Sequence, residues 1–388
     1  MIDATRAADA AAAPRAARAQ RATALIFVAH GLIIGSWAPH IPVAKAEAGV
    51  GPDGLGLILL CMALGAVAAM AFTGAAIARF GSGRVTAVAT LAFCAAFILP
   101  VWAGTAVPLA AALLLFGITT GLMDVAMNAH AVDVEAALGR PAMSGFHGWF
   151  SVGAMLGAAS GGVLLDLMSP LAHALALACG VAVLAAAQFR DLLPRAAGCE
   201  AGASGQFVRP SRASLLLGTL CLIAMMTEGA ILDWSALHLT QEVGAAPGAA
   251  GLGYALLSVG MALSRFLGDR VRAALGSRAT LRGSAAIGAV GLAAAVTTGR
   301  IEVAIAGYVL AGFGIGNLVP VLFSAAGALE PARPGHAIAA VTTLGYSGFL
   351  LGPPIVGALA AAIGLTAALA LLAGGCLAIG LLAHRVGP

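Results

Sequence analysis

Charged residues are scarce in this chain. Only 9% of its 388 residues are Asp, Glu, Lys or Arg, whereas a soluble globular domain carries about 25%. Hydrophobic residues make up 61%, and a water-soluble fold cannot bury that share and still cover itself with polar surface. The composition therefore excludes a soluble domain and indicates that lipid surrounds most of the chain.

Sequence patterns of metal sites and of several enzyme classes are also missing. The six cysteines form no CxxC pair, and the chain contains no HExxH, GxSxG or GxxxxGK[ST] sequence. These patterns mark zinc sites, hydrolases and ATP-binding loops. We therefore expect no enzyme activity, no metal and no cofactor. The basic residues form no extended aromatic-interleaved face, so nucleic-acid binding is not expected either.

Long apolar runs dominate instead. A helix needs about 20 apolar residues to cross the hydrocarbon core, whereas a β-barrel would show short alternating segments. The predicted spans are 22–44, 54–78, 84–103, 106–129, 143–165, 171–189, 213–237, 250–268, 279–298, 303–327, 337–361 and 364–383. The predicted fold class is an all-α membrane protein with twelve transmembrane helices.

Polar segments divide the predicted helices into two bundles of six. Residues 22–190 form the first predicted bundle and 213–384 the second, and the Gly- and Pro-rich segment 191–212 is interpreted as a cytoplasmic interdomain loop. The Ala- and Arg-rich residues 1–21 are predicted to be a disordered cytoplasmic tail rather than a cleaved signal peptide.

The basic residues predict the orientation of the chain. With a cytoplasmic amino terminus, all of the 20 Lys and Arg residues except Lys45 and Arg300 fall on the cytoplasmic side. Membrane proteins concentrate Lys and Arg on that side. Both termini are therefore expected in the cytoplasm.

The two predicted bundles resemble each other when one is shifted by 195 to 197 positions. Trp37 then falls on Trp234 and Gly117 on Gly312, and further glycines coincide in the same order across four helices. Two parallel six-helix repeats are typical of transporters that rock around a solute site between the halves. We therefore expect two pseudo-symmetric halves.

One loop motif resembles a known family. Residues 74–84 read GAAIARFGSGR, which is similar to the Gly-x-x-x-Asp-Arg-x-Gly-x-x-Arg signature of the major facilitator superfamily, with Ala78 at the acidic position. The second bundle carries RFLGDR at 265–270. The resemblance covers the chain after its tail and implies a cytoplasmic gate of four charged residues: Arg79, Arg265, Asp269 and Arg270.

Four further stretches resemble the fucose-permease-like branch of that superfamily, including its uncharacterised bacterial members. They are WAPHIP at 37–42, MDVAMN at 123–128, SGFH at 144–147 and EGAILDWS at 228–235. In that branch, an acid followed four residues later by Asn binds the proton and the sugar, which implies these roles for Asp124 and Asn128. The acid that the fucose permease carries in its first helix has no counterpart here.

Three acids within the predicted spans are candidates for proton coupling. Asp124 lies in the apolar run 107–129, where a charge costs at least about 2.5 kcal/mol, so its side chain should face the bundle interior together with Thr120 and Asn128. No membrane-embedded Lys or Arg is predicted to neutralise it, although it could simply bond a neighbouring helix. Glu228 is an equal candidate, and Asp233 is a third that could instead be solvated near the membrane surface.

Other polar and aromatic side chains are candidates for the solute site. His30 titrates near neutral pH and is a further candidate for proton coupling. Each candidate also has a structural alternative, because Trp often anchors at the membrane interface and His, Asn or Tyr can bond between helices. The candidate solute ligands are Asn128, His147, Trp37, Trp234, Asn317 and Tyr346.

These observations favour a secondary transporter that imports a small polar, sugar-like solute together with protons. It is expected to act as a monomer in the bacterial inner membrane. Gly153-x-x-x-Gly157 resembles a helix 5 signature of proton-driven exporters, but Ala158 replaces its proline and the fourth predicted helix lacks their arginine. A proton-driven exporter and a non-transporting membrane receptor are the alternative hypotheses.

Overall fold

The computed structural model describes residues 2–140, 142–194, 211–329 and 334–386. Within these ranges the side chains are described except at 2–13, 70–71, 144, 269, 327–329 and 334–340. Every regular element in the described part of the chain is a helix.

The helices form two groups that follow the order of the chain. The first group contains α1 (Ile2–Ala48), α2 (Pro52–Phe80), α3 (Ser82–Trp102), α4 (Ala106–Leu138), α5 (Met143–Leu164) and α6 (Pro170–Ala186). The second group contains α7 (Arg212–Leu237), η1 (His238–Glu242), η2 (Pro247–Ala249), α8 (Leu252–Thr297), α9 (Ile301–Ile315), α10 (Leu318–Leu329), α11 (Pro334–Ile363), α12 (Leu365–Leu382) and η3 (Ala383–Arg385).

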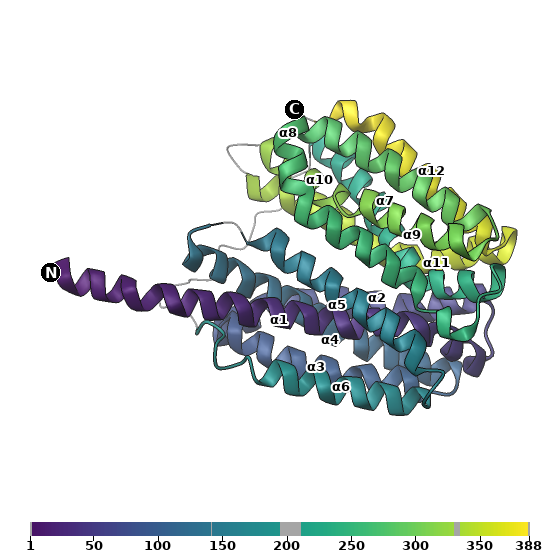
Figure 1. Cartoon of the computed structure of the whole chain (residues 1–388), viewed down its shortest axis with the longest axis horizontal. Coiled ribbons are helices and arrows are strands. Elements are labelled where there is room, and N and C mark those ends of the chain that lie inside the picture. Colours follow the sequence, from purple (N-terminus) through teal and green to yellow (C-terminus); the bar gives the residue numbers. More distant parts are fainter. Residues whose placement is uncertain (1, 141, 195–210, 330–333, 387–388) are drawn as a thin grey trace.

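The two groups lie side by side and are inclined to each other. Both termini lie at the same end of the molecule, which we name the terminal end, and the opposite end is named the far end (Figure 1). The groups converge at the far end and diverge toward the terminal end (Figure 1). The place where they meet is therefore the natural position for a site that both groups share.

The helices have the length and composition of membrane-spanning segments. In the described chain, 10 helical segments are long and apolar enough to cross a membrane, and the apolar helix α6 is shorter. α8 supplies two of these segments. Gly276, with φ 78° and ψ 163°, interrupts the helical geometry of α8. Gly81, between α2 and α3, has φ 84° and ψ 150°. Such positive φ values favour glycine, and these two glycines are separated by the same shift that relates the repeats.

Residues 2–21 are helical in this structure, whereas the sequence predicts a disordered tail. α1 begins at Ile2 and continues without interruption to Ala48. The first part of this helix is rich in alanine, the residue with the highest helix propensity. Nε of Arg18 also forms an ion pair with Oδ1 of Asp191, just after α6, at 3.6 Å. The greater part of the predicted interdomain loop, 195–210, lies outside the described residues.

The predicted helix 303–327 is divided in the structure. α9 ends at Ile315 and α10 begins at Leu318. Pro320 has no backbone N–H, so it cannot donate to the carbonyl of Gly316, and its ring crowds that carbonyl. Proline therefore gives this segment a break in its central part.

Glycines allow the two groups to touch through their backbones at the far end. A Cβ atom on Gly56 of α2 would lie 2.6 Å from the carbonyl oxygen of Pro353, and one on Gly357 of α11 would lie 2.7 Å from that of Pro52. A Cβ on Gly162 of α5 would lie 2.6 Å from the oxygen of Gly248. We name these contacts, at Gly56, Gly357, Gly162 and Gly248, the far-end seam.

Candidate functional site

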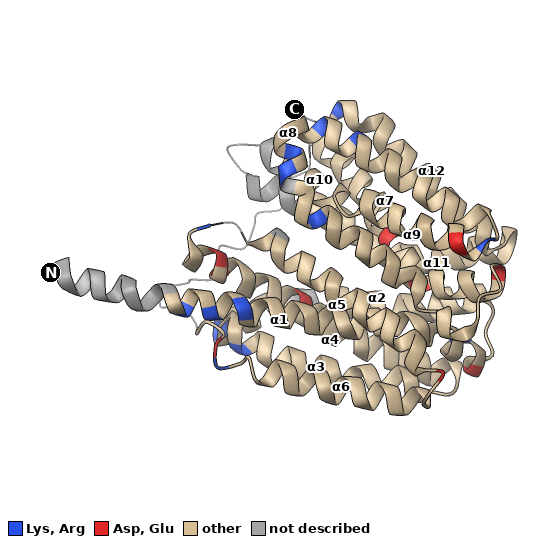
Figure 2. Cartoon of the chain, in the orientation of Figure 1, with Lys and Arg blue, Asp and Glu red and all other residues tan. Residues whose placement is uncertain are grey.

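Most charged residues lie toward the two ends of the bundle, and few lie between them (Figure 2). Four charged residues occupy inner turns of their helices: Asp124 on α4, Glu228 and Asp233 on α7, and Arg265 on α8. A charge inside a membrane-spanning bundle is costly and marks a functional site by default. These four residues are therefore the starting point of the site.

Asp124 lies where the first group meets the second. Oη of Tyr346, on α11, donates a hydrogen bond of 3.2 Å to Oδ2 of Asp124. Nδ2 of Asn128 donates to Oδ1 of Asp124 at 3.2 Å and to its backbone carbonyl at 2.8 Å. The hydroxyl of Thr120 bonds the carbonyl of Phe116 instead. The structure thus brings together the predicted residues Asp124, Asn128 and Tyr346.

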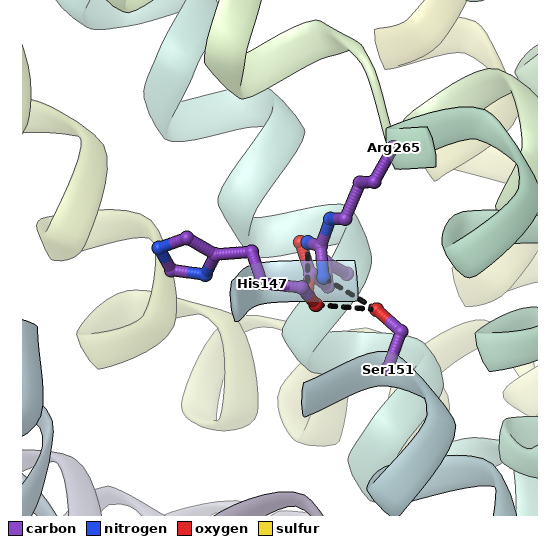
Figure 3. A network of polar contacts seen from close by, with 4 residues as sticks. His147, Ser151 and Arg265 are labelled. Atoms are coloured by element: carbon purple, nitrogen blue, oxygen red, sulfur yellow. Dashed lines mark hydrogen bonds and ion pairs between the residues drawn. The ribbon is translucent and has the colours of Figure 1, made fainter. Parts of the chain in front are cut away.

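Arg265 is the cation of the site. Its Nη2 lies 3.4 Å from Oε1 of Glu228, and the two side chains are 12% and 15% exposed. Its Nη1 donates at 2.7 Å to Oγ of Ser151, on α5 of the other group, and Ser151 in turn donates to the carbonyl of His147 at 3.2 Å (Figure 3). Arg265 therefore links the two groups as Tyr346 does.

The position of Arg265 differs from the sequence prediction. It was expected at a cytoplasmic gate with Arg79, Asp269 and Arg270, but its side chain points into the bundle toward Glu228. Arg270 is exposed, Arg79 lies over the ring of Phe80 at 5.1 Å, and the side chain of Asp269 lies outside the described residues. Arg265 thus places a basic group inside the bundle beside Glu228, while Asp124, for which no basic partner was predicted, has none among the described residues.

One histidine lies near this cation, and a second lies near the first. His147 is within electrostatic range of Arg265, and His30 is within range of His147. The ring of His30 packs against Phe93 at 4.9 Å and Phe150 at 5.4 Å, and neither ring nitrogen has a hydrogen-bond partner among the described residues. His30 is thus buried in an aromatic environment rather than hydrogen-bonded between helices.

Trp37 and Trp234 are buried inside their groups. Each is 1% exposed, and neither indole N–H has a partner in the described chain. Trp37 packs edge-on against Phe116, with ring centroids 6.5 Å apart. Their burial contradicts the alternative in which they anchor at the membrane interface.

Asn317 lies apart from the acids, at the break between α9 and α10. It is 7% exposed, and its side chain covers Gly268 of α8, where a Cβ atom would clash with the amide. Asn317 therefore packs α8 against the broken helix. Among the described residues, Asn317 makes no hydrogen bond or ion pair with Asp124, Glu228 or Arg265.

Sequence reasoning missed Ser151 and Tyr254. Tyr254 is 3% exposed, is hydrogen-bonded to Ser258, and lies within electrostatic range of Glu228, Asp233 and Arg265. Only two signals were available. Ser151 follows His147 by one helical turn, and Tyr254 follows the Gly-Leu-Gly sequence at 251–253, which matches 54–56 in the first bundle. Neither signal shows which face of the helix carries the residue.

Comparison with known proteins identifies the family. Residues 216–387 match the model of the Major Facilitator Superfamily. The chain is 40% identical over 364 residues to an uncharacterized MFS-type transporter of Yersinia pestis, which covers 94% of this chain and 93% of that protein. The chain belongs to the major facilitator superfamily. As a protein of that superfamily it is a membrane transporter, not an enzyme.

Further relatives and structures agree with this assignment. The membrane protein MosC of Rhizobium meliloti is 34% identical over 349 residues, covering 90% of this chain and 85% of that protein. The fold is similar to a mutant form of the nucleoside transporter NupG, with a TM-score of 0.75, 10% identity, and coverage of 95% of this chain and 100% of that one. The human organic anion transporter MFSD10 gives a TM-score of 0.67 at 16% identity, covering 95% of this chain and 99% of that one. At these identities the solved structures show the fold alone.

Proposed function

We propose that this superfamily member is a proton symporter that imports a small polar, sugar-like solute by alternating access. In this proposal it acts as a monomer with twelve transmembrane helices in two six-helix halves, residues 22–190 and 213–384. It lies in the bacterial inner membrane with both termini in the cytoplasm. The motifs at 37–42 and 123–128 support a place in the fucose-permease-like branch.

The observation that carries the proposal is the hydrogen bond from Tyr346 to Asp124, which joins the two groups inside the bundle. A charged carboxylate accepts such a bond more strongly than a neutral one. Protonation of Asp124 therefore weakens a contact between the halves. Proton-coupled rocking requires such a link between protonation and the relative position of the halves. Asp124 is the better proton carrier because Glu228 has Arg265 as its partner.

The arrangement of the two groups supports alternating access. With cytoplasmic termini, the far-end seam closes the outer side, and the halves diverge toward the cytoplasm (Figure 1). Rocking of the two groups against each other would break the bond between Tyr346 and Asp124, part the seam and bring the terminal ends together. The same polar groups would then face opposite sides of the membrane in turn.

Proton uptake by proteoliposomes tests this function. Monosaccharides, amino sugars and small peptides are added in turn to the purified, reconstituted protein, and the external pH is recorded. We expect one solute to make the outside more alkaline, and Asp124→Asn to abolish that signal while solute exchange continues. Asp53→Asn, an exposed acid at the far end, is the matched control.

Two results would contradict the proposal. If no solute moves protons and Asp124→Asn behaves as the wild type, coupling through Asp124 is wrong. If solute enters inverted vesicles only when the vesicle interior is acidic, the protein is an exporter. The structure gives the exporter-like glycines a packing role, because Cβ atoms on Gly153 and Gly157 would clash with the carbonyl oxygens of Val28 and Leu32 on α1.

A further inference from the structure

Three acids and two tyrosines lie near one another in the order Asp124, Tyr346, Glu228, Tyr254 and Asp233. Tyr346 bonds Asp124 and lies within electrostatic range of Glu228. Tyr254 lies within range of Glu228 and of Asp233. We name Asp124, Tyr346, Glu228, Tyr254 and Asp233 the acidic row.

The three carboxylates of the acidic row, when ionised, outnumber the cations that lie beside them among the described residues. Among the described residues, Arg265 is the cation that faces it, and this arginine is paired with Glu228. Asp124 has hydrogen-bond donors but no cationic partner in the described chain. If Asp124 holds the coupled proton, Asp233 is the acid whose charge is left without compensation.

Asp233 is unusual for a buried carboxyl group. It is 8% exposed, and it forms no hydrogen bond or ion pair with any described residue. Buried carboxylates in proteins are almost always paired or hydrogen-bonded, because an isolated charge is expensive to desolvate. The next side chains, the indole N–H of Trp234 and the hydroxyl of Ser235, also lack partners in the part of the chain described here. A buried acid without a partner, at a transport site, is suited to bind a ligand.

We propose that the transported solute carries an ammonium group, which binds Asp233, on a hydroxyl-bearing body such as that of an amino sugar. This inference rests on the transport function proposed above. An ammonium group has three N–H donors and no acceptor, so it complements a carboxylate that has no other donor. The ring of Tyr254, which lies within electrostatic range of Asp233, can add cation–π attraction, while Ser151 and Asn128 can bond hydroxyl groups.

An inorganic ion fits the row less well. Hard cations need six or more oxygen ligands around one point. Glu228 and Asp233 are five residues apart on α7, which corresponds to a rise of about 7.5 Å. Acids spread along a helix in this way suit an elongated organic cation that meets them at separate points.

Sugars with and without an ammonium charge on the same nitrogen provide the test. Glucosamine, galactosamine and mannosamine are compared with their N-acetylated forms, and NaCl is compared with choline chloride, by ligand-induced stabilisation of the purified protein. Each amine is expected to bind at least about tenfold more tightly than its acetylated form, as loss of one charge-assisted hydrogen bond requires. Asp233→Asn should remove that preference, Asp233→Glu should keep it, and the exposed Asp53→Asn should leave it unchanged.

The outcomes separate this inference from the proposed function. Four results would overturn the ammonium site. They are equal binding of amines and N-acetyl sugars, binding of neither, stabilisation by sodium alone, and a preference for amines that survives Asp233→Asn. A neutral sugar that drives proton uptake through Asp124 without any amine preference would overturn it too, while the symporter function would stand. Gel filtration of both Asp233 variants establishes that they are folded.

Discussion

The hydroxyl of Tyr346 on α11 lies 3.2 Å from a carboxylate oxygen of Asp124 on α4, and this hydrogen bond joins two helices from opposite groups of the bundle. A hydrogen bond to a charged group contributes about 1.5 to 3 kcal/mol. The bond exists in the conformation in which the terminal ends diverge. Its removal should therefore make that conformation less populated.

Spin labels at 84 and 278, two exposed positions on opposite groups at the terminal end, report this conformation. Tyr346→Phe is expected to shorten the distance between them. Tyr308→Phe is the matched control, because the Tyr308 hydroxyl bonds His238 within one group at 3.1 Å. Identical distance distributions for wild type and Tyr346→Phe would show that this bond does not hold the groups in place.

Arg265→Gln should strongly destabilise the fold. It leaves Glu228 inside the bundle without its cation, and breaking a buried pair in this way costs about 3 to 5 kcal/mol. The double variant Arg265→Gln/Glu228→Gln should recover more than half of that loss. Unfolding midpoints in detergent measure both effects.

Arg300→Gln is the control for this pair. It breaks an exposed ion pair with Glu302, at 3.9 Å, and exposed pairs contribute at most about 1 kcal/mol. A double variant no more stable than Arg265→Gln alone would mean that the charges do not interact as the structure indicates.

Gly56→Leu should open the far-end seam. A side chain there meets the backbone of α11 at Pro353, so spin labels at Asp53 and Glu302, on opposite groups, should move apart. Gly74→Leu, on the same helix, has no atom within 4 Å of the added Cβ and should leave the distance unchanged. If both variants keep the wild-type distance, the seam is not a close backbone contact.

Gly117→Ala and Gly312→Ala should destabilise the fold by similar amounts, about 1 to 3 kcal/mol for an overpacked position. These glycines occupy equivalent places in the two repeats, and an added Cβ would clash with the carbonyl oxygens of Met62 and Leu257. Gly180→Ala, with open space around it, should slightly raise the unfolding midpoint because alanine favours helix. Unequal effects of the first two would show that the repeats pack differently.

The sequence predicted Asp124 because a single charge in a long apolar run is conspicuous. It also predicted the helical membrane fold from the apolar runs, and the positive-φ glycines at Gly81 and Gly276 follow the repeat that it showed. These features depend on local composition and spacing. They can be read without knowing how helices are rotated.

The pairing of Arg265 with Glu228 and Ser151 could not be predicted in this way. It depends on the rotation of α5, α7 and α8 about their axes and on the reach of a long, flexible side chain. The burial of Trp37 has the same origin, because a tryptophan near a helix end can face lipid or protein. Contacts between helices thus carry the information that spacing along one helix lacks.

The far-end seam also bears on the speed of transport. At Gly56, Gly162 and Gly357 the nearest atoms across the seam belong to the main chain. At these three points the surfaces can part and close again without a change of side-chain rotamer. The activation barrier for opening the far end should then come mainly from hydration of the exposed backbone, and the closed register should be regained each time the halves return.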